Sequence, residues 1–169
     1  MSLTHIKPED IQQNTFKTIG QDWMLLTAGT SRSFNTMTVS WGGLGVLWGK
    51  PVATVYVRPQ RYTYEFMEKD DTFTLSAYPE SMHQALAFCG SKSGRDMDKA
   101  AVCGLQPAED AGGIYFEGAQ LVLCCRKLYY QDLDPSHFLD SSIMKNYANH
   151  DYHRMYIGEI VSVLADTQH

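Results

Sequence analysis

Continuous and alternating apolar runs along the chain predict a protein built mainly from short strands. The apolar runs at 23–28, 52–57 and 72–77 are typical of buried strands. A longer run at 119–130 mixes apolar, β-branched and aromatic residues, and another at 153–165 predicts the last strand. Because a closed sheet leaves no exposed edge, about six strands of this length favour a small barrel.

Helices are expected only between these strands. Apolar spacing predicts amphipathic helices over 60–69 and 80–88, and a shorter helix over 96–102. The sequence Asp-Pro-Ser at 134–136 is typical of a helix start, since proline is favoured in the first turn. The polar stretch 140–151 is expected to be a loop over a site or at a subunit contact.

Glycine marks the expected turns in the second half of the chain. Residues 104–113 contain proline and glycine and are expected to form a loop. Residues 114–117 are expected to pair with the long strand at 119–130 through a turn at Gly118. The whole pattern predicts a mainly β fold, a β-barrel with a few interposed helices.

Composition limits the classes of protein to which this chain could belong. Its 169 residues, 44% hydrophobic and 20% charged, indicate one globular domain over 1–169, in which residues 1–20 form a peripheral segment. The formal net charge of −5 argues against nucleic-acid binding, which usually needs a basic surface. No apolar run reaches the ~18 residues of a membrane span and no secretory leader is evident, so we expect a cytoplasmic protein.

The cysteines are expected to be reduced and structural. Cys124 and Cys125 are adjacent in a predicted strand, where successive side chains point to opposite faces, so they are poorly placed to bond each other. No Cys or His spacing predicts zinc. A metal site built from His150, Asp151 and His153 is disfavoured because no further convergent ligand is visible.

The strand predicted at 35–41 carries the first candidate ligand-binding side chains. Its residues alternate, so Thr36, Thr38 and Ser40 share one face. Each hydroxyl can donate and accept a hydrogen bond, and such a row could bind the heteroatoms of a planar ligand. The alternative is a half-exposed strand with a solvated hydroxyl face.

Two arginines flank the start of the helix predicted over 60–69. A helix N-terminus has unpaired N–H groups and a partial positive charge, which favour a bound anion. Arg58 and Arg61 could bind a phosphate bidentately there, and Thr63 could add a hydroxyl. The alternative is a pair of solvated arginines that form ion pairs with Glu65 or Glu68.

The stretch 89–96 is the second candidate anion site. It combines small residues with two hydroxyls, Lys92 and Arg95, so its backbone N–H groups and cations could contact an anion or the edge of a planar ligand. The alternative is a plain solvated connection. The glycines at 42–49 form neither GxGxxG nor a Walker motif, so the dinucleotide-binding and P-loop arguments do not apply.

Four segments of the chain resemble a known family. They are NTMTVSWGG at 35–43, KPVATVYVRPQRYTYEF at 50–66, FCGSKSGRDMDK at 88–99 and DYHRMYIGEI at 151–160. With them the chain resembles the flavin reductase-like family of FMN-binding split β-barrel proteins, in particular its flavoredoxin-like branch. The resemblance implies a Greek-key-like split barrel that binds FMN at the interface of a homodimer.

The resemblance also implies a role for individual residues. His153 begins a segment similar to the family's H-x-x-x-x-G-E pattern and is the candidate catalytic residue, on the nicotinamide side of the flavin. The residues expected to bind FMN come from the two strand regions and from the loop. They are Asn35, Thr36, Met37, Thr38, Ser40, Arg58, Arg61, Tyr62, Thr63, Ser91, Ser93 and Arg95.

The activity that the resemblance implies is that of an oxidoreductase. The expected reaction accepts hydride from NADH or NADPH and passes electrons to free flavin, a redox partner protein or another acceptor. Because the flavin itself carries out redox chemistry, no catalytic triad or carboxylate pair is required. Two alternatives are a flavoredoxin-like electron carrier with little nicotinamide activity and a non-catalytic flavin-binding module. A related split-barrel branch oxidises pyridoxamine phosphate, and the segments at 35–43 and 90–96 favour the flavin reductase side over that branch.

Overall fold

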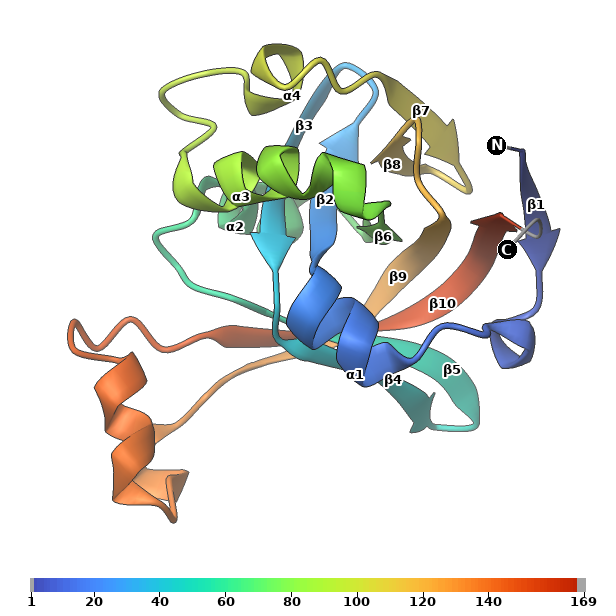
Figure 1. The fold of residues 1–169 in the computed structure, drawn as a ribbon. Helices are drawn as coiled ribbons and strands as arrows, with labels where there is room; N and C mark the ends of the chain where they lie inside the picture. The colour runs from blue at the N-terminus through green and yellow to red at the C-terminus, as the bar shows by residue number, and fades with distance from the viewer. Residues whose placement is uncertain (1, 167–169) are drawn as a thin grey trace.

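The computed structural model describes residues 2–166, and most of its strands form one antiparallel sheet (Figure 1). The strands of this sheet are β1 (Leu3–Ile6), β2 (Met24–Thr30), β3 (Ser33–Val39), β4 (Gly42–Leu47), β5 (Lys50–Val57), β6 (Thr72–Ala77), β9 (Leu121–Asp132) and β10 (Arg154–Asp166). Their spatial order is β3, β2, β6, β9, β10, β5 and β4, and β1 pairs with β10. The mainly β fold predicted from the sequence is confirmed.

Short helices connect these strands. The α-helices are α1 (Thr15–Lys17), α2 (Tyr62–Lys69), α3 (His83–Ser91) and α4 (Lys99–Val102). The 3-10 and π segments are η1 (Pro8–Asp10), η2 (Thr18–Asp22), η3 (Glu80–Met82), η4 (Pro135–His137) and η5 (Ser141–Asn146). Among the described residues, no helix has the length and apolar character needed to cross a bilayer.

The sheet curves into a split barrel and does not close. The hydrogen-bonded path ends at β3 on one side and at β4 on the other, and within residues 2–166 these two strands are not paired. The split barrel expected from the sequence is therefore confirmed, and the closure that the number of strands alone would favour is not formed in the described part of the chain. The physical reason is local: β3 passes into β4 across the exposed Ser40 and Trp41, and each strand uses its pairing edge for a different neighbour.

A small ribbon replaces a hairpin that the sequence analysis predicted. β8 (Gly113–Phe116) pairs with β7 (Pro107–Asp110), which lies in the stretch expected to be a loop, and not with β9. The reason is that β9 is already paired along both edges, with β6 and with β10. Gly118 adopts a left-handed φ of 87° and turns the chain from the ribbon into β9.

Alternation along the strands divides the core into two clusters. Leu26 on β2 lies in a cluster inside the barrel, and its neighbour Leu25 lies in a second cluster beneath α3, α4 and β8. Cys125 and Cys124 on β9 are divided in the same way. All four cysteines are free, as the sequence analysis expected. The outer cluster fixes the position of α3 and α4, whose ends contribute to the site described below.

The connection between β9 and β10 extends away from the barrel, as Figure 1 shows at the lower left. We call residues 133–153 the arm. Its outer part contains η4 and η5, and Leu139 there is fully exposed. Its last residues return to the barrel, where His153 is buried.

Gly158 on β10 has no room for a side chain, and its substitution tests the packing inside the barrel. A Cβ at this position would lie 2.7 Å from two ring carbons of Phe73 and 3.0 Å from the Cβ of Cys125. We expect Gly158→Ala to lower the free energy of unfolding by about 1–3 kcal/mol, because an overpacked core must shift. Urea denaturation measures this change. The control is Gly43→Ala on β4, where a Cβ meets nothing within 4 Å, and equal losses in both variants would contradict the prediction.

Candidate functional site

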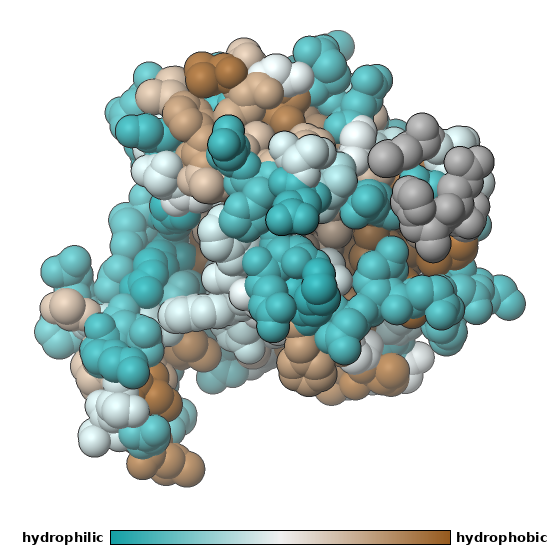
Figure 2. Space-filling view, in the orientation of Figure 1, coloured by the Kyte–Doolittle hydropathy of each residue, from teal (hydrophilic) through white to brown (hydrophobic). Residues whose placement is uncertain are grey.

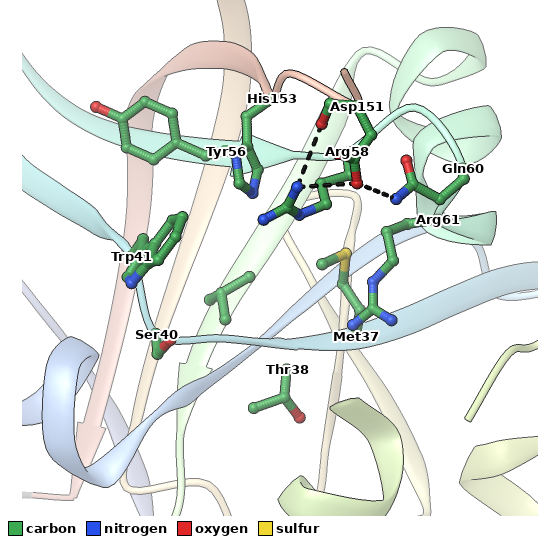
Figure 3. Close-up of a pocket in the computed structure, with 11 residues that line it drawn as sticks. Met37, Thr38, Ser40, Trp41, Tyr56, Arg58, Gln60, Arg61, Asp151 and His153 are labelled. Carbon is green, nitrogen blue, oxygen red and sulfur yellow. Dashed lines mark hydrogen bonds and ion pairs between the residues drawn. The ribbon is translucent and has the colours of Figure 1, made fainter. Parts of the chain in front are cut away.

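A cavity of about 390 Å³ lies beside the end of β3, the end of β5 and the start of the following turn. Figure 3 shows side chains from three separate stretches of chain converging on it. Its lining residues are Met37, Thr38, Val39, Ser40, Trp41, Tyr56, Arg58, Gln60, Arg61, Asp151 and His153. The barrel strands supply one side of the cavity, and the end of the arm supplies the other.

A smaller cavity of about 150 Å³ shares Met37, Gln60 and Arg61 with the first. Its other lining residues come from β3, the first turn of α2, the loop after α3 and the start of α4. They are Asn35, Tyr62, Thr63, Lys92, Ser93, Gly94 and Lys99. The two cavities therefore form adjoining spaces, and cations concentrate in the smaller one.

Arg61 lies where the two cavities meet. Its guanidinium donates one hydrogen bond, from Nη2 to the carbonyl oxygen of Gly90 at 2.8 Å. Burial lowers the pKa of Arg61, and the charge of Arg58 acts in the same direction. Among residues 2–166 no side chain caps the start of α2, and Tyr62 and Thr63 of its first turn line the smaller cavity. This arrangement offers donors and positive charge to an anion.

Arg58 is held by the arm. Its Nη1 donates to Asp151 Oδ2 at 2.9 Å, and its Nη2 donates to the carbonyl oxygen of Asn146 at 3.0 Å. The guanidinium carbon also lies 5.0 Å from the ring centroid of Tyr147, within cation–π range. Gln60 donates to the same carboxylate oxygen of Asp151 at 2.6 Å. Arg58 therefore joins β5 to the arm, and its guanidinium already has several partners.

Arg58 and Arg61 do not form the alternative ion pairs with Glu65 or Glu68 in the described structure. Glu65 accepts from Arg95 at 2.7 Å, and Glu68 accepts from Arg154 at 3.0 Å. These carboxylates therefore have other partners, and the two site arginines line the cavities.

Lys99 is a site residue that the sequence analysis missed. It is 4% exposed, its Nζ donates to the carbonyl oxygen of Cys89 at 2.9 Å, and it lines the smaller cavity. Burial lowers the pKa of its ammonium to about 8. The nearest sequence signal is Asp98, a good N-cap residue that does cap α4 through the N–H of Ala101, but it indicates only where the helix starts.

The hydroxyl row on β3 is only partly available to a ligand. Thr36 bonds the hydroxyl of Thr27 at 2.9 Å, and the hydroxyl of Thr38 donates to the carbonyl oxygen of Leu86. Thr38 still lines the larger cavity, and the exposed Ser40 lies at its edge. Asn35 donates to the hydroxyl of the buried Thr63 at 2.8 Å and so ties β3 to α2.

The loop after α3 contributes less than predicted. Ser93 lines the smaller cavity and accepts from the backbone N–H of Arg95 at 3.2 Å. Ser91 donates back to Phe88, and the Arg95 guanidinium lies over the ring of Tyr62 at 4.9 Å. Of the predicted residues, Thr36, Ser91 and Arg95 line neither of the two cavities, and the others line at least one.

His153 is buried at the arm side of the larger cavity. Its ring lies 5.2 Å from that of Trp41 and 6.4 Å from that of Tyr56, between centroids, and Figure 3 shows the three rings together. Its Nδ1 lies 2.7 Å from the hydroxyl of Tyr147. Burial lowers the pKa of His153 to about 4, and the charge of Arg58 acts in the same direction. The imidazole is therefore neutral at physiological pH.

The residues considered as a metal site have other partners. Asp151 is bound by Arg58 and Gln60, and Nδ1 of His150 lies 3.0 Å from the hydroxyl of Tyr152. Over the part of the chain that the structure describes, no group of three metal-ligating side chains is found.

Comparison with known proteins gives one family match. The model of the flavin reductase like domain matches residues 16–169. No curated protein shows a significant sequence match to the chain.

Solved structures share the fold at low sequence identity. An FMN-binding domain of a flavin reductases-like enzyme from Shewanella baltica OS155 aligns with a TM-score of 0.72 and 20% identity, over 99% of this chain and 78% of that one. Flavoredoxin of Desulfovibrio vulgaris (Miyazaki F) aligns with a TM-score of 0.67 and 21% identity, over 96% and 78%. The styrene monooxygenase flavin reductase from Pseudomonas putida S12 aligns with a TM-score of 0.65 and 18% identity, over 87% and 80%.

Proposed function

We propose a function from the premise that this chain belongs to the flavin reductase-like family: it is an FMN-binding oxidoreductase that accepts hydride from NADH or NADPH. The electrons then pass to free flavin or to another acceptor. The bound flavin would supply the redox chemistry, and the protein would supply binding, orientation and electrostatics. The two adjoining cavities support this proposal, because Arg61, Lys92 and Lys99 line the smaller one and the rings of Trp41 and Tyr56 line the larger one.

The smaller cavity suits the phosphate end of FMN. Arg61 and Lys99 bring positive charge, the first turn of α2 brings backbone N–H groups, and the hydroxyl of Ser93 is close by. The buried Lys99 is the observation that carries the proposal. An ammonium has three donors, and within residues 2–166 the only protein partner of Lys99 Nζ is one carbonyl oxygen. A buried cation of this kind is costly unless an anion pairs with it.

The larger cavity suits the flavin ring. Trp41 and Tyr56 provide aromatic surface, Met37 provides a polarizable apolar side chain, and Thr38 and Ser40 provide hydroxyls along β3. His153 and the end of the arm form the remaining side. Its volume of about 390 Å³ lies within the range usual for small-molecule sites.

An absorption experiment tests the proposal. The purified protein is reconstituted with FMN, freed of excess flavin, and followed anaerobically as NADH and then NADPH are added in excess. We expect a bound flavin whose absorbance near the visible maximum bleaches at a catalytically useful rate. A protein that binds no FMN would refute the proposed function. A bound flavin that stays oxidised with both nucleotides would refute the nicotinamide activity and favour an electron carrier or a flavin-binding module.

We propose further that the protein works as a homodimer with the flavin site at the subunit interface. Large hydrophobic side chains are exposed beside the cavity and on the neighbouring strands, namely Trp41, Val46, Trp48, Tyr129 and Tyr130. In Figure 2 hydrophobic atoms gather on the arm and along the lower edge of the barrel. Exposed aromatic and apolar side chains favour a protein–protein contact on this side of the molecule. Native mass spectrometry is expected to give twice the 19.1 kDa chain mass, and a single-chain mass at micromolar concentration would contradict the dimer.

A further inference from the structure

The buried contact between Tyr147 and His153 bears on which ring nitrogen of His153 carries the proton. The tyrosine hydroxyl lies 2.7 Å from Nδ1 of the imidazole, and the two residues are 4% and 7% exposed. Tyr147 comes from the arm, directly after η5, and does not line either cavity. Its hydroxyl therefore acts on the cavity through His153.

Tyr147 is firmly held in this position. The ring of Phe138 stacks on it at 5.8 Å with an interplanar angle of 22°, and Arg58 lies over its face. Its backbone N–H donates to the carbonyl oxygen of Met144 at 2.9 Å. A side chain packed in this way presents its hydroxyl in one direction, toward His153.

The chemistry of the two groups decides which one donates. Burial raises the pKa of the Tyr147 phenol, so it keeps its proton at physiological pH. Among the described residues its hydroxyl has no other partner, so the proton is used only if Tyr147 donates to His153. An unprotonated imidazole nitrogen is a good acceptor for such a donor. The proton of the neutral imidazole must then be on Nε2.

Nε2 of His153 is open to the cavity. Within residues 2–166 it has no hydrogen-bond partner, yet it is not among the buried polar side-chain atoms that lack one. It is therefore accessible from the cavity that His153 lines. The charged and titratable groups around the ring are Arg58, Arg61, Asp151, Tyr56 and Tyr147.

We propose that Tyr147 is a positioning residue that holds His153 in its Nε2–H tautomer, so that a neutral N–H donor faces a carbonyl oxygen of the ligand in the cavity. The identity of that ligand rests on the proposed function. The tautomer does not depend on it, because it follows from contacts within the protein. A neutral donor suits a carbonyl oxygen and adds no charge beside Arg58 and Arg61.

Nitrogen NMR of histidine tests the tautomer directly in the flavin-free protein. The ¹⁵N shifts and couplings of the imidazole distinguish the two neutral tautomers, and His153→Gln identifies the signals. From pH 5 to 8 we expect the wild type to show protonated Nε2 and unprotonated Nδ1 at His153. We expect Tyr147→Phe to show a mixture of both tautomers. Wild-type protein with its proton on Nδ1 would overturn the proposal.

Tyr152→Phe is the matched control. Tyr152 also lies in the arm and contacts Tyr147, but its hydroxyl pairs with His150, which lines neither cavity. In the Tyr152→Phe variant we expect His153 to have the same tautomer as in the wild type. An equal change in both variants would indicate general loosening of the arm and would overturn a specific role for Tyr147.

Ligand binding tests the donor role. Saturation with FMN, alone or with the nicotinamide product, is expected to shift the Nε2 resonance of wild-type His153. With NADH as donor, Tyr147→Phe is expected to change KM or kcat by about three- to tenfold, the range for one neutral hydrogen bond. An Nε2 resonance that does not move with any bound ligand would overturn the donor role. Failure of FMN to bind at all would refute the proposed function, whereas the tautomer would still be decided in the flavin-free protein.

Discussion

Lys99→Met is expected to weaken FMN binding by about 10- to 150-fold and, at the same time, to stabilise the flavin-free protein. The loss of affinity follows from losing a charge-assisted hydrogen bond to the phosphate, a contact worth about 1.5–3 kcal/mol. The gain in stability follows from burial, because the ammonium is 4% exposed with one carbonyl partner. Methionine has a similar length and carries no charge into the core.

The size of the stability effect depends on pH. The pKa of Lys99 in the folded protein is about 8, below its ordinary value of 10.5. Between these values the unfolded chain holds more protons at this position than the folded protein does, so stability gains from rising pH. The stability advantage of Lys99→Met over the wild type should therefore be full below pH 8 and should shrink as the pH approaches 10.5.

The measurements are fluorescence quenching of FMN for affinity and urea denaturation without FMN for stability. Lys92→Met is the control, because Lys92 lines the same cavity but is exposed. Its affinity loss should be clearly smaller and its stability unchanged. An unaltered dissociation constant for Lys99→Met would show that the phosphate does not bind in this cavity.

Arg58→Met and Arg61→Met are expected to have different effects, although the two residues are three positions apart. Arg61 has one carbonyl partner and lines both cavities, so its loss should reduce FMN affinity to an extent similar to that of Lys99→Met. Arg58 holds Asp151 and Asn146. Its loss should release the end of the arm and raise amide exchange rates over 146–153 by about tenfold.

Hydrogen exchange by mass spectrometry, together with FMN titration, separates the two roles. The pKa of Asp151 is lowered from its ordinary value of 3.8 by its hydrogen bond to Gln60 and by Arg58. Its contribution to holding the arm is therefore present above about pH 4 and is lost as the pH falls through the lowered value. If Arg58→Met reduced FMN affinity as strongly as Arg61→Met and left the arm protected, Arg58 would be a phosphate ligand and not an anchor of the arm.

Local patterns predicted much of the fold. The strand expected at 72–77 is β6 with the same bounds, and the apolar spacing of 60–69 correctly indicated α2. Both are indicated by the local pattern of apolar and polar residues. β7 was not predicted, because its short polar sequence forms a strand only through its pairing with β8.

The candidate site was likewise predicted only in part. The position of Arg61 before a helix indicated an anion site, and the structure places it beside two cavities. The hydrogen bond from Arg58 to Asp151 could not be predicted, because Asp151 lies 93 positions later in the chain. The burial of Lys99 depends on how α4 packs on the outer core cluster, and a lysine in a short helix gives no local sign of it.

The arm makes the cavity a composite of two parts that are joined through Arg58. The segments at the start of α2 and α4 supply the cationic end with Arg61 and Lys99, whereas the arm supplies His153, Asp151 and the support of Tyr147. Insertions or deletions between η4 and η5 would leave every barrel pairing intact, since surface connections tolerate changes of length. Exchanging the arm between related chains would therefore alter one side of the larger cavity, and with it the access of an acceptor to the proposed flavin site, while Arg61 and Lys99 stay in place.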